Sequence, residues 1–240
     1  MGVVLLAPKL ESIEFHVTDI YPPEWAYNLG IHTIECKNLK RFALILKDRR
    51  HIRRFDYSRL KRLVQHCPDI ETLIYDQPID SEDLKWFSRW KNLKHLGFAL
   101  NSDAGNSTSH LSEEKLKSFF VNKGLKLESL IVRADRNSES QLISFLPFCP
   151  NLRRLDIHEV ENLTWETAEY ICKNSCPNLL HLILPQKLIP MTGDIPGENS
   201  GPKNGALKIA FKEPAASSVS KKASVTKNEK KNAWLKSVSF

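Results

Sequence analysis

Cys172 and Cys176 come nearest, by type and spacing, to a metal site. Three residues separate them, and His181 follows five positions after the second cysteine. Structural zinc takes four ligands, usually as two closely spaced pairs, and the sequence offers no second pair. Three further cysteines stand in the same local context as Cys176: Cys36, Cys67 and Cys149. We therefore expect core or turn cysteines, with no metal ion and no cofactor.

The sequence contains none of the common catalytic motifs. G-x-G-x-x-G, G-x-x-x-x-G-K-[ST], G-x-S-x-G and H-E-x-x-H are all absent. The adjacent carboxylates Glu113 and Glu114 follow Ser112, which has the type of a helix N-cap. Acidic residues favour the first turn of a helix because of its dipole, so the pair needs no catalytic role. We predict that the chain is not an enzyme.

A basic run, KDRRHIRRFDYSRLKR at residues 47–62, has eight Lys or Arg against two Asp. It offers an anionic partner, such as an acidic protein segment, a phosphate or an RNA backbone, four closely spaced arginines: Arg49, Arg50, Arg53 and Arg54. A solvated loop and helix face is the simpler interpretation, because aromatic residues for base stacking are sparse and no nucleic-acid-binding motif is present. We therefore do not expect nucleic acid as a partner.

Composition limits the class of protein and its compartment. The 240 residues, 41% of them apolar, suit one domain plus a tail. No run of 18 apolar residues supports a membrane span, and the first residues lack the pattern of a signal peptide. Five cysteines argue against a closed disulfide framework. We expect a cytoplasmic or nuclear protein, or both, without membrane contact.

The net charge of +7 is uneven along the chain. Residues 193–240 hold nine Lys and four acidic residues, and the remaining 192 residues carry only +2. The basic balance therefore describes mostly a tail and is weak support for a nucleic-acid-binding fold. We predict a folded domain at 1–190 and a mostly disordered, Lys- and Ser-rich tail at 191–240.

One phrase, L-x-x-L-x-L with Ile or Phe allowed in the apolar positions, recurs seven times. Its copies are LESIEF (10–15), LKRFAL (39–44), IETLIY (70–75), LKHLGF (93–98), LESLIV (127–132), LRRLDI (152–157) and LLHLIL (179–184). Their starts are 29, 31, 23, 34, 25 and 27 residues apart. Such regular recurrence indicates a repeat protein.

The spacing within each copy predicts a short strand, because its last two apolar residues point to one face. Between copies, residues 56–66, 138–146 and 164–174 have apolar residues at helical spacing. Ser81 and Ser112 are candidate N-caps, and Gly124 is placed to end a helix. Stacked strand–helix units predict an α/β solenoid of about seven irregular repeats, with a parallel sheet on the concave side and helices on the convex side.

The sequence resembles the leucine-rich repeat family over about residues 8–189. The lead-ins CPNL at 149–152 and 176–179, with CPDI at 67–70, are similar to the cysteine-containing repeats of F-box leucine-rich-repeat proteins. The resemblance implies a horseshoe-shaped solenoid. The Asn or Cys usual at the ninth repeat position occurs only at Asn101. The F-box is not visible, because the first repeat begins near residue 8; the chain is either a fragment or shortened form, or it never had one.

The in-between strand positions predict a concave binding face. A small or apolar centre beside charged residues is typical of protein-binding surfaces, and Arg133 and Arg154 are the expected anchors. The predicted partner-binding residues are Arg41, Ile74, Asp76, His95, Ile131, Arg133, Arg154, Asp156, His158 and His181. His16, His95, His158 and His181 could also form a pH-sensitive or metal-binding surface, but ordinary contact residues are the simpler interpretation.

These features favour a non-enzymatic, monomeric protein-interaction solenoid. The resemblance implies the substrate-recognition region of an F-box-type ubiquitin ligase subunit, which would bind a cullin-type ligase adaptor only if an F-box lies upstream. The alternative is a ubiquitin-independent scaffold that binds RNA or an acidic partner through residues 47–62 and the tail. The ligase role rests on family analogy.

Overall fold

The computed structural model describes residues 9–17, 37–46, 57–100, 111–134, 139–189 and 207–212. Within these ranges, eight parallel strands form one open sheet whose order follows the chain. The strands are β1 (Ser12–Val17), β2 (Arg41–Leu46), β3 (Thr72–Pro78), β4 (His95–Leu100), β5 (Ser129–Ala134), β6 (Arg154–Val160), β7 (His181–Pro185) and β8 (Lys208–Lys212). The predicted α/β class with a parallel sheet is confirmed.

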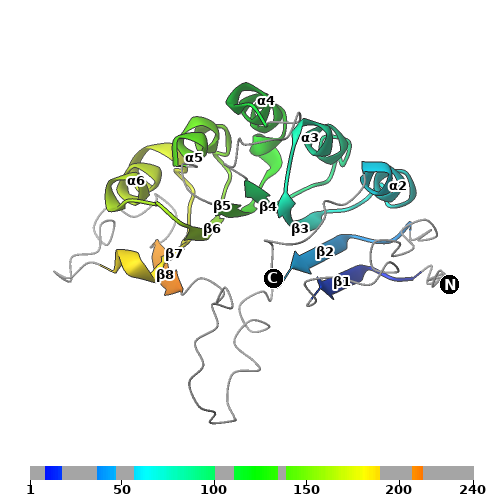
Figure 1. Cartoon of the computed structure of the whole chain (residues 1–240), viewed down its shortest axis with the longest axis horizontal. Coiled ribbons are helices and arrows are strands. Elements are labelled where there is room, and N and C mark those ends of the chain that lie inside the picture. Colours follow the sequence, from blue (N-terminus) through cyan, green and yellow to red (C-terminus); the bar gives the residue numbers. More distant parts are fainter. Residues whose placement is uncertain are drawn as a thin grey trace, which may run out of the picture.

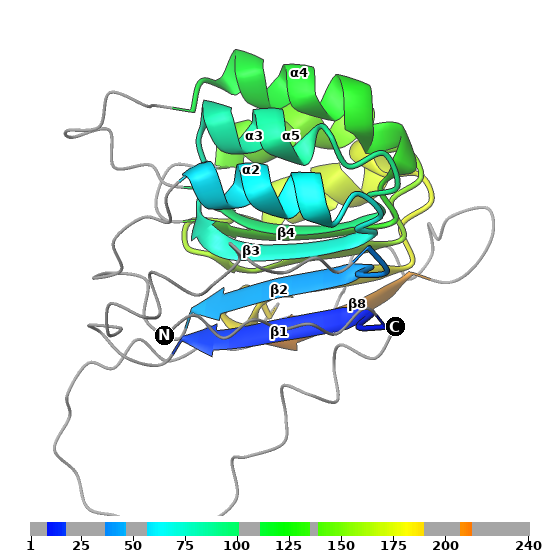
Figure 2. The same cartoon turned by 90° about the vertical axis from the view of Figure 1, so that its right-hand side faces the viewer.

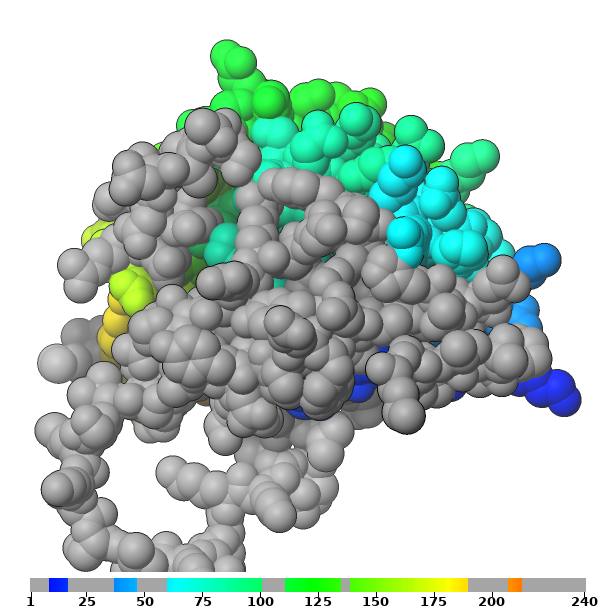
Figure 3. All heavy atoms as spheres, turned by 45° about the vertical axis from the view of Figure 1, so that its right-hand side comes forward, coloured from blue at the N-terminus to red at the C-terminus, as the bar shows by residue number. Residues whose placement is uncertain are grey.

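The helices that the structure describes follow successive strands and lie on one face of the sheet. They are α2 (Tyr57–His66), α3 (Ser81–Phe87), α4 (Glu113–Lys123), α5 (Glu139–Phe145) and α6 (Trp165–Tyr170). Shorter turns complete the elements: η2 (Gly124–Lys126), η3 (Leu146–Phe148), η4 (Ile171–Ser175) and η5 (Gln186–Leu188). The sheet curves in an arc with the helices outside it (Figures 1 and 2). Figure 3 shows α2, α3 and α4 side by side on that outer surface.

β8 corrects the expected number of strands from seven to eight. It pairs with β7, which aligns Ile209 with Leu182 and Phe211 with Leu184. The sequence ALKIAF at 206–211 is an eighth copy of the phrase with Ala in its first position. This strand lies within 191–240, which we expected to be mostly disordered. Apart from Leu207 and β8, the residues of that segment lie outside the described ranges, so the domain boundary at 190 stays a prediction.

The two apolar positions of each phrase form the core between sheet and helices. The parallel register places one set side by side on successive strands: Phe42, Leu73, Leu96, Leu130, Leu155 and Leu182. Each of these side chains is at most 1% exposed. Burying one large apolar side chain stabilises a fold by about 1.5–3 kcal/mol. Because each strand contributes one such residue, the apolar core runs without interruption along the sheet.

Aromatic rings fill the core under the middle of the sheet. Phe120 of α4 stacks on Phe145 of α5 with ring centroids 4.2 Å apart. Phe98 of β4 lies 6.1 Å from Phe120 and 6.4 Å from Phe145. The three rings therefore join one strand to the two helices that cover it.

Capping explains where two helices begin. Ser112 caps α4, and its hydroxyl accepts a hydrogen bond from the Lys115 backbone N–H at 3.3 Å. α3 differs from the prediction, because Asp80 rather than Ser81 is its N-cap. The Asp80 carboxylate accepts from the backbone of Asp83 at 3.1 Å, and the Asp83 carboxylate accepts from the backbone of Asp80 at 3.0 Å. This reciprocal capping box satisfies two backbone donors, which a serine one residue later would not do.

Gly124 follows α4 for a reason other than the one expected. Its φ of −58° is right-handed, so no left-handed turn requires glycine there. A Cβ atom at this position would lie only 2.1 Å from the Phe148 carbonyl oxygen. Gly124 thus allows the close approach of two consecutive turns of the solenoid.

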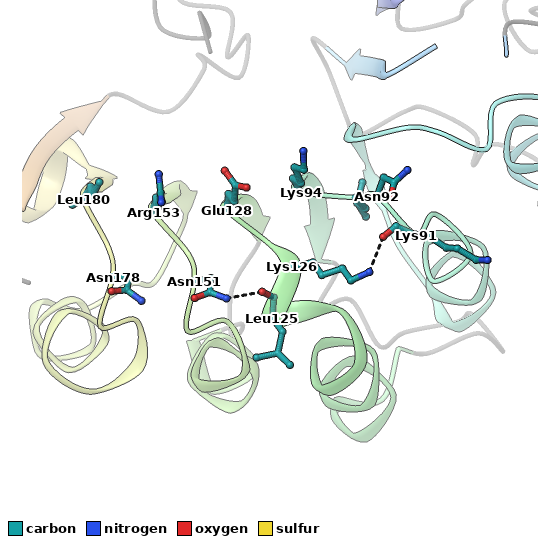
Figure 4. Close-up of a pocket in the computed structure, with 11 residues that line it drawn as sticks. Lys91, Asn92, Lys94, Leu125, Lys126, Glu128, Asn151, Arg153, Asn178 and Leu180 are labelled. Carbon is teal, nitrogen blue, oxygen red and sulfur yellow. Dashed lines mark hydrogen bonds between the residues drawn. The ribbon is translucent and has the colours of Figure 1, made fainter. Parts of the chain in front are cut away.

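A ladder of side-chain hydrogen bonds joins the turns just before the strands. In three phrases the residue preceding the first apolar residue donates to a backbone carbonyl of the previous turn, whereas Asn92 of a fourth donates to the Asp69 carboxylate at 3.4 Å. Asn151 donates to Leu125 at 2.8 Å, and Lys126 to Lys91 at 3.1 Å (Figure 4). Asn178 donates to the Pro150 carbonyl at 2.9 Å. The Asn of the C-P-N lead-in is therefore a structural link between repeats.

Candidate functional site

The open face of the sheet, opposite the described helices, carries the predicted partner-binding residues in rows. The first row crosses the strands near their amino ends and contains Arg41, Thr72, His95, Ser129, Arg154 and His181. A second row contains Ile74, Gly97, Ile131, Asp156 and Ile183. The structure thus brings Arg41, His95, Arg154 and His181 into one line.

The first row is the accessible part of the predicted site. His181 is exposed, and Arg41, His95 and Arg154 are half-buried. Arg41 donates to the Glu14 carboxylate of β1 at 3.2 Å. Burial lowers the pKa of His95, although the nearby Glu128 acts in the opposite direction. His95 therefore favours the neutral form, in which imidazole can donate and accept hydrogen bonds.

The centre of the open face is closely packed. Ile74 is 5% exposed, and Ile131 is half-buried. A Cβ atom at Gly97 would lie 3.3 Å from the Ile74 side chain and 3.4 Å from that of Ile131. The two isoleucines therefore enclose Gly97, and the apolar centre offers less surface than expected.

Arg133 corrects the prediction of an exposed anchor. Its side chain is 4% exposed and forms an ion pair with Asp76 of β3, whose side chain is fully buried. Its Nε atom lies 3.4 Å from a carboxylate oxygen of Glu159. Burial alone would lower the pKa of Arg133, but the two carboxylates outweigh it and raise the pKa. Arg133 is part of a buried charge cluster.

Asp156 and His158 of β6 are also buried, at 4% exposure each. The His158 Nδ1 atom lies 2.5 Å from Asp156, and its Nε2 atom lies 3.4 Å from Glu159. Burial would lower the pKa of His158, whereas the hydrogen bonds to both carboxylates raise it above its ordinary value. Lys212 of β8 reaches Asp156 at 3.8 Å. The cluster thus connects the eighth strand to the sheet interior.

A break in strand register explains the participation of Glu159, which sequence analysis missed. β5 and β6 pair regularly until Ile131 meets Asp156, but Arg133 then pairs with Glu159. Such a bulge redirects side chains, so Glu159 turns toward Arg133. Strict alternation had assigned that place to His158 alone. No signal in the sequence marks the bulge.

The cysteines that the structure describes lie in the core or, for Cys172, pack against it, whereas Cys36 lies outside the described residues. Cys67, Cys149 and Cys176 are at most 2% exposed. Burial raises the pKa of Cys172 to about 11 and that of Cys176 to about 12. Buried, protonated thiols of this kind behave as small apolar side chains in the core. No three His, Cys, Asp or Glu side chains in the described ranges form a group that could hold a metal ion.

The amino ends of the strands carry a charge row, which sequence analysis also missed. Its members are the second residues of the first six phrases: Glu11, Lys40, Glu71, Lys94, Glu128 and Arg153. Backbone hydrogen bonds of 2.8–2.9 Å join consecutive members, so they are direct neighbours. Acidic and basic residues alternate without exception until Leu180. This alternation is visible in the sequence once the repeats are aligned.

Two members of the charge row form an ion pair. Lys94 donates to Glu71 at 2.9 Å. This hydrogen bond, with the added charge of Lys40, lowers the pKa of Glu71, and it raises the pKa of Lys94. This ion pair stabilises the charged forms of both Glu71 and Lys94.

A groove of about 670 Å³ lies beside the charge row. The residues that line it come from four consecutive turns: Lys91, Asn92, Leu93, Lys94, Leu125, Lys126, Glu128, Asn151, Arg153, Asn178 and Leu180. Figure 4 shows Lys94, Glu128, Arg153 and Leu180 along one side and Lys91, Lys126, Asn151 and Asn178 along the other. Four of the lining side chains are basic and one is acidic.

The structure does not test the predicted basic patch at residues 47–62, and it tests the absence of a membrane span only for the described residues. Arg49, Arg50, Arg53 and Arg54 lie outside the described residues. In the parts of the chain that the structure covers, no helix is long and apolar enough to cross a membrane.

Comparisons with solved structures give distant likenesses. No protein-family model and no curated protein matches the sequence. A chain in the crystal structure of the Rad7 and Elc1 complex in yeast is similar, with a TM-score of 0.31 and 14% identity. The match covers 70% of this chain, and this chain spans 60% of that one. A likeness this distant carries no conclusion about function.

Proposed function

We propose that the chain is a non-enzymatic, leucine-rich-repeat-type scaffold that binds a protein partner on the open face of its sheet. The observation that carries this proposal is the accessible first row, in which Arg41, His95, Arg154 and His181 lie in register. A row of polar side chains on a stiff sheet is preorganised, so little conformational freedom is lost on binding. Arg, moreover, is enriched at binding hot spots.

The further proposal is that the partner is a substrate of an F-box-type ubiquitin ligase. The support is the resemblance of the C-P-N-L lead-ins to the repeats of F-box leucine-rich-repeat proteins, and it is an analogy of family. The four described cysteines are free, which is compatible with action in the cytoplasm or nucleus.

Affinity purification with two charge-reversal variants tests the binding face. Arg154→Glu reverses the charge at one accessible position of the first row, and His181→Glu adds a negative charge at another. Lys61→Glu combined with Lys187→Glu is the control, since both lysines are exposed and lie off this face. We expect quantitative mass spectrometry to find partners that bind the wild type and the control but not the first variant. Equal recovery with all three proteins would reject the open face as the binding surface.

The ligase role has a separate readout. Purification from cells that express the longest native form of the protein should recover a cullin-type ligase adaptor. Its absence would remove the ligase proposal and leave the binding proposal standing. Recovery of RNA that is lost on neutralising the arginines at 49–54 would instead favour the ubiquitin-independent alternative.

A further inference from the structure

The groove beside the charge row is separate from the open face and has its own chemistry. It runs across the starts of four consecutive repeats, from Lys91 to Asn178 and Leu180. Its volume of about 670 Å³ lies within the range of binding pockets, about 300–1,000 Å³. We propose that this groove binds an extended acidic peptide segment with one apolar residue at its centre.

The first reason is the way in which the charge row ends. Inside the row, each charge has an opposite charge on both sides, as for Lys94 between Glu71 and Glu128. Arg153 has Glu128 on one side but Leu180 on the other. No hydrogen bond or ion pair of the Arg153 side chain occurs within the described ranges. Its charge is therefore less compensated than that of its neighbours and attracts an anion.

The lead-in side of the groove adds positive charge without acidic neighbours in its lining. Lys91 and Lys126 lie on this side, where the Lys126 ammonium donates to the Lys91 carbonyl at 3.1 Å. With Lys94 and Arg153 opposite, the groove lining has four basic side chains and one acidic one, Glu128, although Lys94 also forms an ion pair with Glu71 beside the groove. The first 192 residues together carry only +2, so the groove is a local concentration of positive charge.

Asparagines space these charges and suit a peptide backbone. Asn151 and Asn178 each donate an amide N–H to the preceding turn, at 2.8 and 2.9 Å. These bonds fix the amide planes and leave the Oδ1 atoms as acceptors for the N–H groups of a peptide laid along the groove. Adjacent strands are about 4.8 Å apart, so four of them span about 14 Å, which an extended chain covers with four or five residues.

An apolar side chain identifies the class of occupant. Leu125 lines the groove on its lead-in side and is 61% exposed, with its side chain pointing away from Lys94, Glu128 and Arg153 (Figure 4). Burial of its exposed surface favours a partner with an apolar residue at that point. The basic groups are spread along the groove rather than converging on one point as a phosphate would require. No aromatic side chain lines it for base stacking. These features favour an acidic peptide over a phosphate or RNA.

Fluorescence polarisation with a labelled peptide tests the proposal. The probe is Glu-Asp-Glu-Leu-Glu-Asp-Glu, and its comparisons are the Gln/Asn analogue and a form with Gly in place of Leu. We expect binding of the acidic probe to weaken with added salt and to be absent for the neutral analogue. Lys91→Glu combined with Arg153→Glu should raise the dissociation constant about tenfold. Leu125→Ser should abolish the preference for Leu over Gly.

The control variant is Lys61→Glu combined with Lys187→Glu, which changes the net charge equally but lies outside the groove lining. It should change the dissociation constant by less than about twofold, because charges beyond a Debye length are screened. Equal weakening by both double variants would reject the groove as the site. Competition by oligouridine RNA that exceeds the acidic peptide in affinity would reject the peptide as occupant. The groove variants leave Arg154 and His181 unchanged, so the peptide-binding test can fail or succeed independently of the open-face test.

Discussion

Charged residues lie at both ends of the strands, but they are exposed to solvent at one end and buried at the other. At the amino ends, the charge row alternates acid and base along the surface, and its members are exposed or half-buried. Toward the carboxyl ends, Asp76, Arg133, Asp156 and His158 are 1–4% exposed. Surface ion pairs contribute about 0–1 kcal/mol, whereas a buried charge without its partner costs several kcal/mol. The first arrangement tolerates substitution, and the second does not.

The comparison separates recognition from architecture. A side chain that binds a partner must lose its hydration at a small cost in free energy. It must also be free of strong ion pairs and hydrogen bonds within its own chain. Arg153 meets that condition, and Arg133 does not, although sequence alone ranked Arg133 as an anchor. The two arginines thus differ in environment because Arg133 lies near the carboxyl end of β5, whereas Arg153 directly precedes β6.

Replacing each arginine by methionine is the sharpest test of this difference. Arg133→Met leaves Asp76 and Glu159 buried beside an apolar side chain, and we expect a loss of about 3–5 kcal/mol in the free energy of unfolding. Arg153→Met should change it by less than about 0.5 kcal/mol. Urea unfolding followed by circular dichroism measures both. Arg133→Lys, which keeps the charge, should fall between them, and equal losses at both positions would contradict the comparison.

The amino-end side has one position that should not tolerate change. Gly124→Ala places a methyl group against the Phe148 carbonyl, and we expect a loss of about 1–3 kcal/mol from overpacking. Gly97→Ala meets only side-chain atoms at 3.3–3.4 Å, so its loss should be smaller. Thermal unfolding of the two variants checks the order. A larger loss at Gly97 would show that the open face is the more tightly packed region.

The pKa values of two histidines on the open face should be shifted in opposite directions. The pKa of His158 is raised and that of His95 is lowered relative to the ordinary 6.5. The contribution of His158 to stability is therefore present below pH 6.5 and is lost as pH rises through its folded pKa. Stability linked to His95 is present above pH 6.5 and falls as pH drops toward its folded pKa.

NMR titration of the imidazole signals measures both pKa values directly. His158→Gln should also lower the free energy of unfolding by about 1 kcal/mol at acidic pH, where the protonated imidazole donates to the Asp156 and Glu159 carboxylates. His95→Gln should remove the decrease of stability on acidification. Identical pKa values for the two rings would mean that the two ends of the strands share one electrostatic environment.

The smallest effect is expected within the charge row. Lys94→Glu places three carboxylates side by side with Glu71 and Glu128, and like charges on adjacent strands repel. We expect a small decrease in Tm at low salt that disappears near 1 M NaCl, where the Debye length is about 3 Å. Lys94→Leu is the control, because Leu180 occupies the same position in the last full phrase. A decrease in Tm that persists in high salt would indicate lost packing instead.

The repeated phrase was sufficient to predict the α/β class with a parallel sheet, because it encodes which strand residues face the helices. It predicted seven of the strands, and the eighth was missed because Ala206 replaces the first leucine of its phrase. The rows of the open face were also predictable from alternation. The burial of Arg133 and the role of Glu159 were not, since both depend on a bulge between β5 and β6 that repeat alignment does not encode.

The side-chain ladder between turns has a direction that bears on synthesis of the chain. In each described case the donor, such as Asn151 or Asn178, belongs to the later turn and the accepting carbonyl to the earlier one. Domains form from the amino terminus while the ribosome adds about 5–20 residues per second. Each acceptor carbonyl therefore leaves the ribosome before its donor side chain does. The earlier turn can thus accept the hydrogen bond as soon as the later turn is synthesised.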